Sequence, residues 1–481
     1  MGVSEQGLLS SLNEDQKNAV RCTEGPLLVL AGAGTGKTKV ITTRIAYLLK
    51  RGVAPSQILA LTFTRKAAVE MSVRIEELVG RKPRGLTVST FHSLGFRMLR
   101  EMNQARSLRV LAEEDLFKFF QKLPGCSYMD TELTLNQISR AKNWGLSPQD
   151  VYQNAQDAGE VDFSTSYREY ETAMRKAGAI DLDDMVGLPL KLLQESEELR
   201  SRYQRRWRYV LVDEYQDTNR VQYLLTRAVL GEHTNICVVG DDDQSIYGFR
   251  GAEPKRILSF KDDFPNTTVI ALTMNYRSHA EIITLANAII SRAQTRYPKN
   301  LHSSLGLGAK VDWKQVGNEG SEAAYIAEQI QDLTASKEFS FGDIAVISRI
   351  TKDATLIYEV LKERKLPCAM GKAAANRNAV SVMTLHQAKG LEFPVVFIPA
   401  LEEDTLPHYH ALQEGPSALE EERRLLYVAV TRAKKRLFLS ASSSRNNHDR
   451  TVSRFLRELP ERTSLRWRDD FSGFLANLGK V

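Results

Sequence analysis

The chain has 481 residues, of which 42% are hydrophobic and 26% charged, and its formal net charge is +6 at pH 7. Because a domain usually holds about 150 residues, this length predicts roughly three packing units. The hydrophobic fraction is typical of a globular protein, and the sequence has no apolar run long enough to span a bilayer, which argues against an integral membrane protein. The small excess of positive charge permits binding to a phosphate backbone without predicting it.

Signals for targeting and for metal binding are weak. The N-terminal residues MGVSEQ have neither the basic nor the long apolar stretch of a signal peptide, so we expect a cytoplasmic protein in a bacterial or viral setting, or a nuclear one. The cysteines are scattered rather than paired, which favours reduced, buried thiols over zinc or an iron–sulfur cluster; they are Cys22, Cys126, Cys237 and Cys368.

In chain order, the first part of the sequence alternates apolar runs with helix-like segments. Residues 27–31 lead through a glycine-rich turn into a helix-like segment at 37–49, the order of a buried parallel strand followed by a helix. Further strands are expected at 58–63, 209–212, 236–239 and 269–272. The distances between them leave room for crossover helices, so this part predicts an α/β domain.

The sequence between residues 99 and 203 is charged and helix-periodic, which predicts a mostly helical insertion in that domain. A second group of strands follows, and it predicts a second α/β domain, with strands at 344–347, 381–385, 395–398 and 437–440 and helices at 354–361 and 419–430. Residues 371–378 form a small polar joint within this second domain, and the sequence after Pro460 is typical of a weakly structured tail.

The glycine-rich turn has the sequence AGAGTGKT at residues 31–38. Small residues at this spacing let backbone N–H groups surround phosphates at a helix N-terminus. Lys37 would neutralise the β- and γ-phosphates, and Thr38 would offer its hydroxyl to Mg²⁺. The first position is alanine instead of the usual glycine, and a turn that binds no nucleotide is the alternative.

An apolar strand later in the chain ends in adjacent carboxylates, LVDEYQD at residues 211–217. Asp213 would hold Mg²⁺ directly or through water, and Glu214 would orient and deprotonate the attacking water. Alone, such a pair is more often a cap or a solvated pair. Together with the phosphate loop it indicates a magnesium-dependent phosphoryl hydrolase.

These motifs belong to an ordered series. Its other members are NEDQ at 13–16, LTFTRKAA at 61–68, TFHS at 90–93, GDDDQSIYGFRGA at 240–252, NYRS at 275–278, TLHQAKGLEF at 384–393 and YVAVTRA at 427–433. From about residue 8 to residue 460 the chain resembles the UvrD/Rep-like superfamily 1 DNA helicases. The resemblance implies two RecA-like P-loop NTPase domains with parallel sheets, at 1–100 plus 201–267 and at 268–460, with the helical insertion at 101–200 and a C-terminal tail at 461–481.

The resemblance also implies how the nucleotide is bound. Gln16 would read the adenine edge, Tyr276 would stack on the adenine, and Glu392 would contact the ribose. The candidates for binding ATP are Gln16, Gly34, Gly36, Lys37, Thr38, Arg44, Tyr276 and Glu392.

Three further residues complete the catalytic candidates, beside Lys37 and Glu214. Gln244 would sense the γ-phosphate. By the same resemblance, Arg277 and Arg432 would be arginine fingers from the second domain. The physics agrees, since a guanidinium offered across a cleft stabilises phosphoryl charge only when the cleft closes. For Arg432 the alternative is a helix-end arginine that binds carbonyl oxygens.

On the nucleic-acid side, Phe63, Tyr247 and Phe249 would stack on unpaired bases, which any base sequence allows. Burial in the core is the alternative, and it is strongest for Phe63 at the end of an apolar strand. The family usually has tryptophan at the Phe249 position, so stacking there is expected to be weaker. Contacts to phosphate and sugar are expected from Thr90, His92, Arg250, Thr384 and His386.

One departure from the family concerns the second domain. Relatives usually carry a large helical insertion between the arginine motif at Arg277 and the strand near Ser381, and the sequence here leaves no room for one. The predicted ATP contacts lie outside that insertion, so we expect the motor to survive its loss, with modest unwinding unless a partner helps.

The resulting expectation is a 3′-to-5′ DNA helicase and single-strand translocase that hydrolyses ATP with Mg²⁺ in the cleft between two RecA-like domains. Its DNA would be single-stranded or a duplex with a single-stranded tail, and it would be a monomer in isolation, with possible accessory proteins of DNA repair or replication. The alternative is an ATPase stimulated by single-stranded DNA that remodels protein–DNA complexes with little or no unwinding.

Overall fold

The first parallel sheet is built from strands that are apolar along their whole length. Helices cover both faces of such a sheet, so inward and outward side chains are all buried, as in β1 and β2. The strand order is β3-β2-β6-β7-β1-β8, and the paired strands from β3 to β1 run parallel. Their bounds are β1 Leu27–Ala31, β2 Ile58–Thr62, β3 Thr87–Thr90, β6 Tyr209–Val212, β7 Ile236–Gly240 and β8 Thr268–Leu272.

This computed structural model describes residues 5–102, 108–123, 128–156, 158–248, 255–371, 378–460 and 466–467. The chain divides into two units. The first unit comprises Met1–Leu30, Lys37–Gly240 and Tyr247–Ala271. The second comprises Ala31–Gly36, Asp241–Ile246 and Leu272–Val481. Two short segments that follow strands β1 and β7 of the first sheet therefore belong to the second unit.

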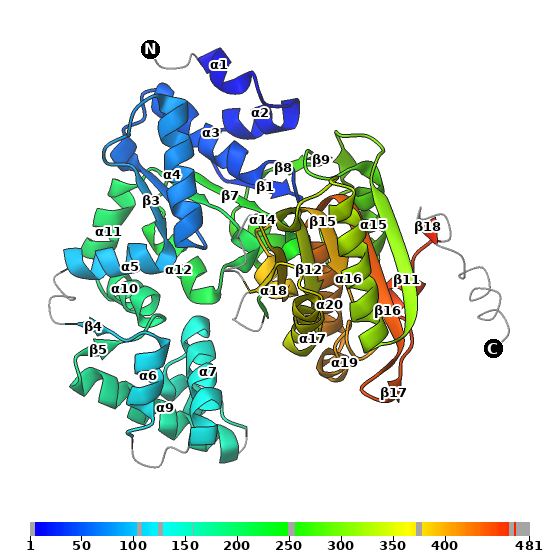
Figure 1. Cartoon of the computed structure of the whole chain (residues 1–481). Helices are drawn as coiled ribbons and strands as arrows, with labels where there is room; N and C mark the ends of the chain where they lie inside the picture. The colour runs from blue at the N-terminus through cyan, green and yellow to red at the C-terminus, as the bar shows by residue number, and fades with distance from the viewer. Residues whose placement is uncertain are drawn as a thin grey trace. The chain divides into compact units, whose positions relative to one another are not determined.

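Helices of the first unit surround this sheet (Figure 1). Several of them begin where the sequence supplies a cap: Asn13 and Gln16 form a capping box before α2, and Thr64 caps α4. Their bounds are α1 Glu5–Leu9, α2 Glu14–Arg21, α3 Lys37–Lys50, α4 Arg65–Val79, α5 Phe91–Glu101, α12 Arg220–Val229, α13 Lys255–Leu258 and α14 Phe260–Asp263.

The segment between α5 and β6 is mostly helical, as the sequence predicts. It contains α6 Glu113–Phe120, α7 Tyr128–Trp144, α8 Pro148–Gln153, α9 Ala158–Lys176, α10 Asp184–Glu195 and α11 Glu197–Arg206, with a small parallel pair of β4 Arg109–Val110 and β5 Ala179–Ile180. Gly95 of α5 packs against α10 so closely that a Cβ atom there would collide with the carbonyl oxygen of Met185. At the centre of the insertion, Lys142 forms ion pairs of 2.7 Å with Glu171, Asp181 and Asp184.

The second sheet lies in the second unit and has the order β13-β14-β12-β15-β16-β11-β18, with β17 paired antiparallel to β16. All other pairs in it are parallel. The bounds are β11 Lys310–Asn318, β12 Ile344–Ser348, β13 Cys368–Met370, β14 Val380–Thr384, β15 Phe393–Ile398, β16 Ala433–Arg445, β17 His448–Asp449 and β18 Arg466–Trp467. A short parallel pair, β9 Met274–Asn275 and β10 His302–Ser303, stands apart from the sheet.

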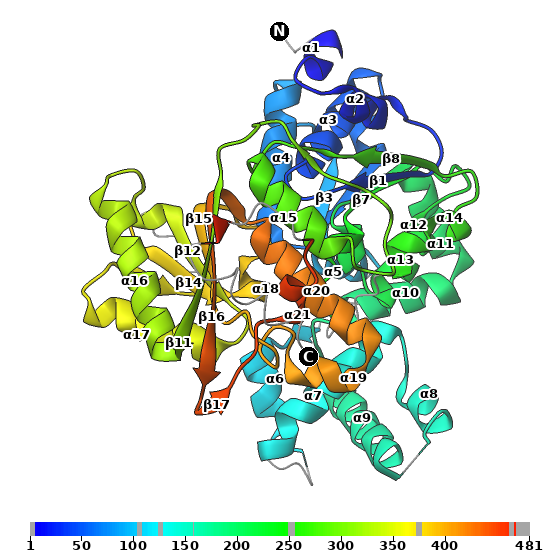
Figure 2. The same ribbon diagram turned by 90° about the vertical axis from the view of Figure 1, so that its right-hand side faces the viewer.

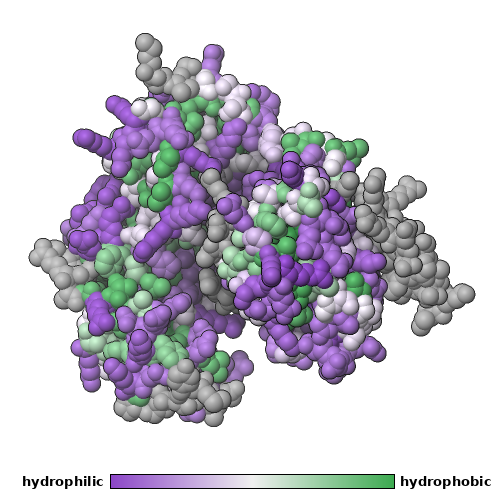
Figure 3. Space-filling model, in the orientation of Figure 1, coloured by the Kyte–Doolittle hydropathy of each residue, from purple (hydrophilic) through white to green (hydrophobic). Residues whose placement is uncertain are grey.

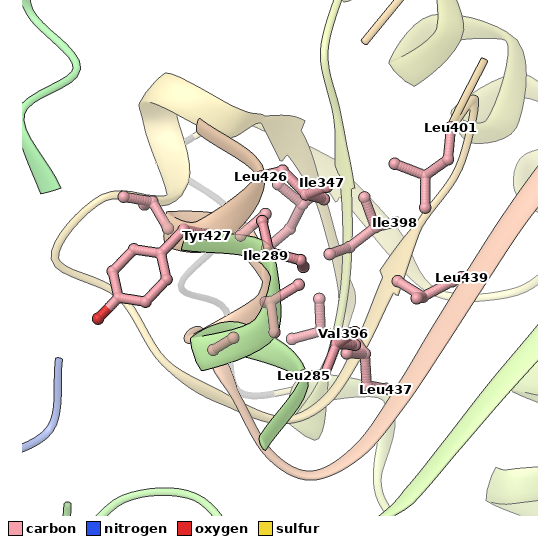
Figure 4. Close-up of a cluster of buried hydrophobic side chains, with 14 of the residues drawn as sticks. Leu285, Ile289, Ile347, Val396, Ile398, Leu401, Leu426, Tyr427, Leu437 and Leu439 are labelled. Atoms are coloured by element: carbon pink, nitrogen blue, oxygen red, sulfur yellow. The ribbon is translucent and has the colours of Figure 1, made fainter. Parts of the chain in front are cut away.

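Helices cover both faces of the second sheet (Figure 2). The helices α15 Ala280–Ile290 and α20 Pro416–Val430 pack on one face, and α16 Glu319–Ala335 and α17 Thr351–Glu363 pack on the other. Figure 4 shows the first of these cores, in which aliphatic side chains of the two helices meet those of the strands. Shorter helices are α18 Leu385–Ala388, α19 Tyr409–Glu414 and α21 Arg454–Arg457.

The α/β fold with two parallel sheets is confirmed, and most strand predictions agree with the structure within two residues. The sequence patterns do not predict β3, the nine-residue β11, the three-residue β13 or the two-residue strands. The expectation of buried thiols is wrong for Cys22 and Cys368, which are half-buried, while Cys237 is buried and Cys126 lies outside the described residues.

The surface is mainly hydrophilic on the face drawn in Figure 3, with smaller hydrophobic areas between the polar side chains. Among the described residues, none of the helices combines the length and the apolar character that a bilayer span requires.

Candidate nucleotide and nucleic-acid site

The predicted phosphate loop connects strand β1 to helix α3. Gly34 and Gly36 have φ angles of 67° and 88°, in the left-handed region that residues with a Cβ atom rarely adopt. Lys37 is the first residue of α3, and it and Thr38 are partly accessible to solvent. A helix N-terminus that follows a left-handed glycine turn presents backbone N–H groups to an anion, so these residues suit a phosphate group.

The turn of this loop is held by residues of the NYRS motif. The side-chain amide of Asn275 donates a 2.7 Å hydrogen bond to the carbonyl of Ala33, and the backbone N–H of Tyr276 donates one of 2.9 Å to Gly34. A Cβ atom at Gly34 would lie 2.6 Å from Nδ2 of Asn275 and 2.7 Å from Cβ of Arg277. Glycine is therefore required there for space as well as for backbone conformation.

The two predicted catalytic carboxylates follow strand β6. Asp213 is buried, and its backbone N–H donates to the carbonyl of Leu61 at 2.9 Å. Burial raises the pKa of Asp213 to about 7, helped by the charge of Glu214 and opposed by that of Lys37. Burial disfavours the charged form of the Asp213 carboxylate, and a nearby cation would stabilise that form. Asp213 therefore suits a divalent cation such as Mg²⁺, which prefers oxygen ligands.

Glu214 has an unusual backbone conformation. Its φ and ψ angles are 50° and 45°, in the left-handed region, where a glutamate is strained. Its carboxylate accepts a 2.6 Å hydrogen bond from the side-chain amide of Gln216. The strained backbone and this amide fix the direction of the carboxylate, as a group that orients a water molecule requires.

Gln244, the predicted γ-phosphate sensor, is held from three sides within the second unit. Its amide nitrogen donates to Oδ2 of Asp241 at 2.5 Å, and its side-chain oxygen accepts from Nη2 of Arg432 at 3.4 Å. Its backbone carbonyl accepts from Nζ of Lys389 at 2.7 Å. Lys389 was missed by the sequence reasoning, although it lies inside the quoted motif TLHQAKGLEF.

The structure brings both predicted arginine fingers to the same end of α20. Arg432 follows this helix and is buried, with Nε donating to the carbonyl of Val428 at 2.8 Å. Nη1 of Arg277 donates to the carbonyl of Thr431 at 3.3 Å. Arg432 thus makes the carbonyl contacts of the helix-end alternative and also reaches Gln244.

Three other nucleotide candidates differ in how they are held. The side-chain oxygen of Gln16 accepts from the backbone N–H of Asn13 at 3.1 Å, which orients its amide. Tyr276 has 46% of its surface exposed, as a ring that stacks on a base requires. Arg44 is buried and donates from Nη1 to the carbonyl of Ala19 at 2.9 Å, so it also holds the end of α2.

On the predicted nucleic-acid side, Phe63 and Tyr247 stack on one another, with ring centroids 5.5 Å apart and an angle of 13° between the planes. Phe63 is only half-buried, whereas the alternative, a side chain of the core, would be fully buried. Tyr247 is buried. Phe249 and Arg250 lie outside the described residues.

The remaining residues that are predicted to contact the DNA strand lie in two helix starts with the same local structure. Thr90 caps α5 at the end of β3, and Thr384 caps α18 at the end of β14, with φ and ψ of −84° and 162° at both. His92 and His386 each lie two residues further on, half-buried. Burial and the charge of Arg65 lower the pKa of His92, which favours a neutral imidazole.

A phosphate loop after one parallel strand, and an acidic pair at the end of another strand of the same sheet, define a P-loop nucleotide hydrolase. The chain belongs to the UvrD/Rep family of superfamily 1 helicases. The profile of the UvrD/REP helicase N-terminal domain matches residues 12–265, and that of the UvrD-like helicase C-terminal domain matches residues 270–375 and 371–444.

Similar curated proteins are bacterial helicases. The ATP-dependent DNA helicase PcrA of Staphylococcus epidermidis is 29% identical, over 94% of this chain and 87% of the relative. PcrA of Bacillus subtilis is 30% identical, over 94% of this chain and 86% of the relative. The ATP-dependent DNA helicase UvrD1 of Mycobacterium tuberculosis is 30% identical, over 96% of this chain and 86% of the relative.

These alignments bear on the missing insertion. The alignment with the Staphylococcus epidermidis protein runs over 633 positions, more than the 481 residues of this chain, so the relative carries segments that this chain lacks. The two matched segments of the C-terminal profile meet at residues 371–375. This is the polar joint at which the sequence leaves no room for a helical insertion.

Proposed function

We propose that this protein is an ATP-dependent motor that translocates 3′-to-5′ along single-stranded DNA and unwinds duplexes that carry a single-stranded tail. Membership of the helicase family supports ATP and DNA as its ligands. The observation that supports coupling of ATP hydrolysis to movement along DNA is the sequence of the short segment Asp241–Ile246 and its neighbour Tyr247. The predicted γ-phosphate sensor Gln244 and the predicted base-stacking ring of Tyr247 are only three residues apart on it.

The residues of this chain divide the work on the nucleotide. Gly34, Gly36 and the first turn of α3 bind the phosphates, with Lys37 placing positive charge at the β- and γ-phosphates. Tyr276 stacks on the adenine, and Gln16 reads its edge. Glu214 takes the proton of the attacking water, in the orientation that Gln216 and the left-handed backbone impose.

Arg277, Arg432 and Gln244 stabilise the charge on the transferred phosphoryl group. Arg432 donates to Gln244 and to the carbonyl of Val428, and Arg277 donates to the carbonyl of Thr431, so binding of the γ-phosphate would exchange these hydrogen bonds for its own. Such an exchange couples the arrival of the γ-phosphate to a rearrangement of this end of the second unit.

Thr38 and Asp213 would hold Mg²⁺, because the raised pKa of Asp213 leaves a position that a cation would stabilise. When bound, this ion neutralises charge on the phosphates. Two neighbours act on the Asp213 carboxylate itself: Lys37 opposes the rise in its pKa, and the Glu214 backbone N–H donates to its Oδ1 at 3.0 Å.

For DNA, the stacked pair Phe63 and Tyr247 is our candidate base platform, with Phe249 and Arg250 following it in sequence. The two capped helix starts at Thr90 and Thr384, each with a histidine nearby, are candidates for backbone contacts. The proposed motor is a monomer with RecA-like domains at 1–100 plus 201–267 and at 268–460, a helical insertion at 101–200 and a tail at 461–481. Its proposed setting is the bacterial cytosol, which the bacterial relatives support.

A second function is favoured by one observation. The insertion that relatives carry near residue 375 is missing here, and a motor without it could move along a strand and displace bound proteins with little unwinding. The resulting activity would be a single-strand-stimulated ATPase and translocase that remodels protein–DNA complexes.

The test is steady-state ATPase with and without single-stranded DNA, together with unwinding of duplexes bearing a 3′ or a 5′ tail. Stimulation with opening of only the 3′-tailed duplex supports the helicase. Stimulation without opening, combined with displacement of a protein block from a single strand, supports the remodeller. An ATPase that stays silent at saturating single-stranded DNA contradicts both.

A further inference from the structure

Lys299 lies in a buried ionic cluster with three consecutive aspartates of the GDDDQ motif. Its ammonium nitrogen is 3.0 Å from Asp241, 2.5 Å from Asp242 and 2.7 Å from Asp243, and only 1% of its side chain is exposed. All of these residues belong to the second unit. A lysine buried this completely is rare unless its charge is compensated.

Two more groups close the cluster. Arg296 donates two hydrogen bonds to the carboxylate of Asp243, from Nε at 2.8 Å and from Nη2 at 2.7 Å. The backbone N–H of Tyr297 donates to Oδ2 of Asp242 at 2.7 Å. The three acidic oxygens lie as close together as metal ligands do, but the ammonium of Lys299 already supplies the cation.

The cluster reaches the catalytic machinery at one point. Asp241 uses Oδ1 for Lys299 and Oδ2 for the side-chain amide of Gln244. Asp242 and Asp243 bind the same lysine, and among the described residues their side chains form hydrogen bonds and ion pairs with residues 296–299. Lys299, together with the backbone N–H of Asp243 at 3.3 Å, therefore holds the carboxylate that in turn holds Gln244.

The segment that carries Lys299 also supports the phosphate loop. A Cβ atom at Gly32 would collide with the side chain of Leu301, so this side chain lies directly against the loop. The hydroxyl of Tyr427 lies at the backbone of Ala33, and its ring points away from the aliphatic core around Leu426 (Figure 4). The short stretch 296–301 thus contacts both the loop and the segment with Gln244.

We propose that Lys299 is a positioning residue for ATP hydrolysis: by neutralising Asp241 it holds the side chain of Gln244 in the direction from which the γ-phosphate is sensed. The inference rests on the proposed function, because it assigns a position to the sensor of that reaction. Among the described residues, the hydrogen bonds and ion pairs of the Lys299 ammonium go to the three aspartates, so its effect on Gln244 passes through Asp241.

The test compares Asp241→Ala with Asp242→Ala. Both variants remove one carboxylate from Lys299, but only Asp241 also accepts from Gln244. Misplacing a catalytic group by about 1 Å costs on the order of 100-fold in rate. We expect Asp241→Ala to lower the DNA-stimulated kcat about tenfold or more below that of Asp242→Ala, with the KM for ATP within about threefold in both.

Lys299→Met and Lys299→Arg test the lysine. We expect the methionine variant to lose DNA-stimulated kcat while it still binds a fluorescent ADP analogue, and we expect arginine to restore part of the rate because it keeps the charge. Arg445→Met is the control, since Arg445 is also buried against three carboxylates of the second unit but has no link to Gln244 in the described residues. All rates are expressed per folded molecule, with the folded fraction taken from thermal melts.

The outcomes separate this inference from the proposed function. If the wild-type chain shows no DNA-stimulated ATPase, the proposed function fails. If the wild type is stimulated but Asp241→Ala and Asp242→Ala have equal kcat, or Lys299→Met loses no more rate per folded molecule than Arg445→Met, the positioning role is wrong. If Lys299→Met does not fold, Lys299→Gln, which keeps hydrogen-bond donors but loses the charge, takes its place, with Arg445→Gln as its control.

Discussion

Arg277 and Glu392 form an ion pair in which Nε and Oε2 are 2.6 Å apart. The other carboxylate oxygen of Glu392 lies 2.7 Å from Nζ of Lys434. Burial raises the pKa of Glu392, but the charges of Arg277 and Lys434 outweigh it and hold this pKa below its ordinary value. The resemblance to helicases assigns these two residues separate roles, at the γ-phosphate and at the ribose. Their pairing indicates that Glu392 also sets the direction of the Arg277 guanidinium.

Arg277→Ala is expected to lower the DNA-stimulated kcat about 10³-fold, in the range by which arginine fingers accelerate phosphoryl transfer. Arg277→Lys should not restore it, because lysine lacks the planar fork that binds two oxygens. Glu392→Gln keeps the size of the side chain but weakens the ion pair, so we expect a smaller loss of kcat, about tenfold. Steady-state kinetics in ATP measures all three. If Glu392→Gln changes only the KM for ATP and not kcat, Glu392 contacts the ribose but does not orient Arg277.

Lys37→Ala and Glu214→Gln are expected to abolish turnover for different reasons. Lys37 neutralises phosphate charge, so its removal weakens nucleotide binding, whereas Glu214→Gln keeps the side-chain shape and removes only the base. Binding of a fluorescent ATP analogue, measured beside ATPase, separates the two. Similar loss of nucleotide binding in both variants would contradict these separate roles.

The sequence was a good guide to the sheets because a strand buried on both faces is apolar along its length. Residues 27–31 and 209–212 were predicted with the bounds that the structure gives to β1 and β6. Strand β11 was missed because it alternates polar and apolar residues, and its apolar Val311 and Trp313 are buried while Lys314 and Gln315 are exposed. Short apolar runs predict central strands better than strands near an edge.

The candidate site was predicted through its motifs, and its internal contacts were not. Local sequence places Gln244 beside Asp241, but Lys299 is 57 residues from its partner Asp242, and Lys389 is 145 residues from its partner Gln244. A buried ionic cluster has no periodicity along the chain, and a lysine in the polar sequence TRYPKN is expected at the surface. Only the fold brings these charges together.

Phe63→Ala and Tyr247→Ala are expected to weaken binding to single-stranded DNA by about 1–3 kcal/mol each, the usual contribution of a ring that stacks on a base. Because the two rings stack on one another, their effects should not add in the double variant. Fluorescence anisotropy of a labelled oligonucleotide at fixed salt measures the affinity, and thermal melts report any loss of folding. Unchanged affinity with lowered thermal stability would assign both rings to the core.

The stability of the first unit is expected to depend on pH through Asp183 in the helical insertion. Burial raises the pKa of Asp183 to about 6, with help from the charge of Asp181, against about 4 in an unfolded chain. Because the pKa of Asp183 is higher in the folded chain, Asp183 contributes fully to the free energy of unfolding below about pH 4. This contribution is lost as the pH rises through about 6. Asp183→Asn should lack this loss, which amounts to about 3 kcal/mol.

Urea unfolding followed across this pH range measures the effect as the difference in midpoint between wild type and Asp183→Asn, which should grow in favour of the variant as the pH rises. Asp150→Asn is a control with the opposite sign, because the hydroxyl and backbone N–H of Ser147 lower the pKa of Asp150. Its contribution is present above the unfolded pKa and is lost as the pH falls through the folded one. If the midpoint difference between wild type and Asp183→Asn stays constant with pH, Asp183 is charged to the same extent in the folded and the unfolded chain. In that case the hydrogen bond that Asn143 donates to Asp183 at 3.1 Å offsets the effect of burial on its pKa.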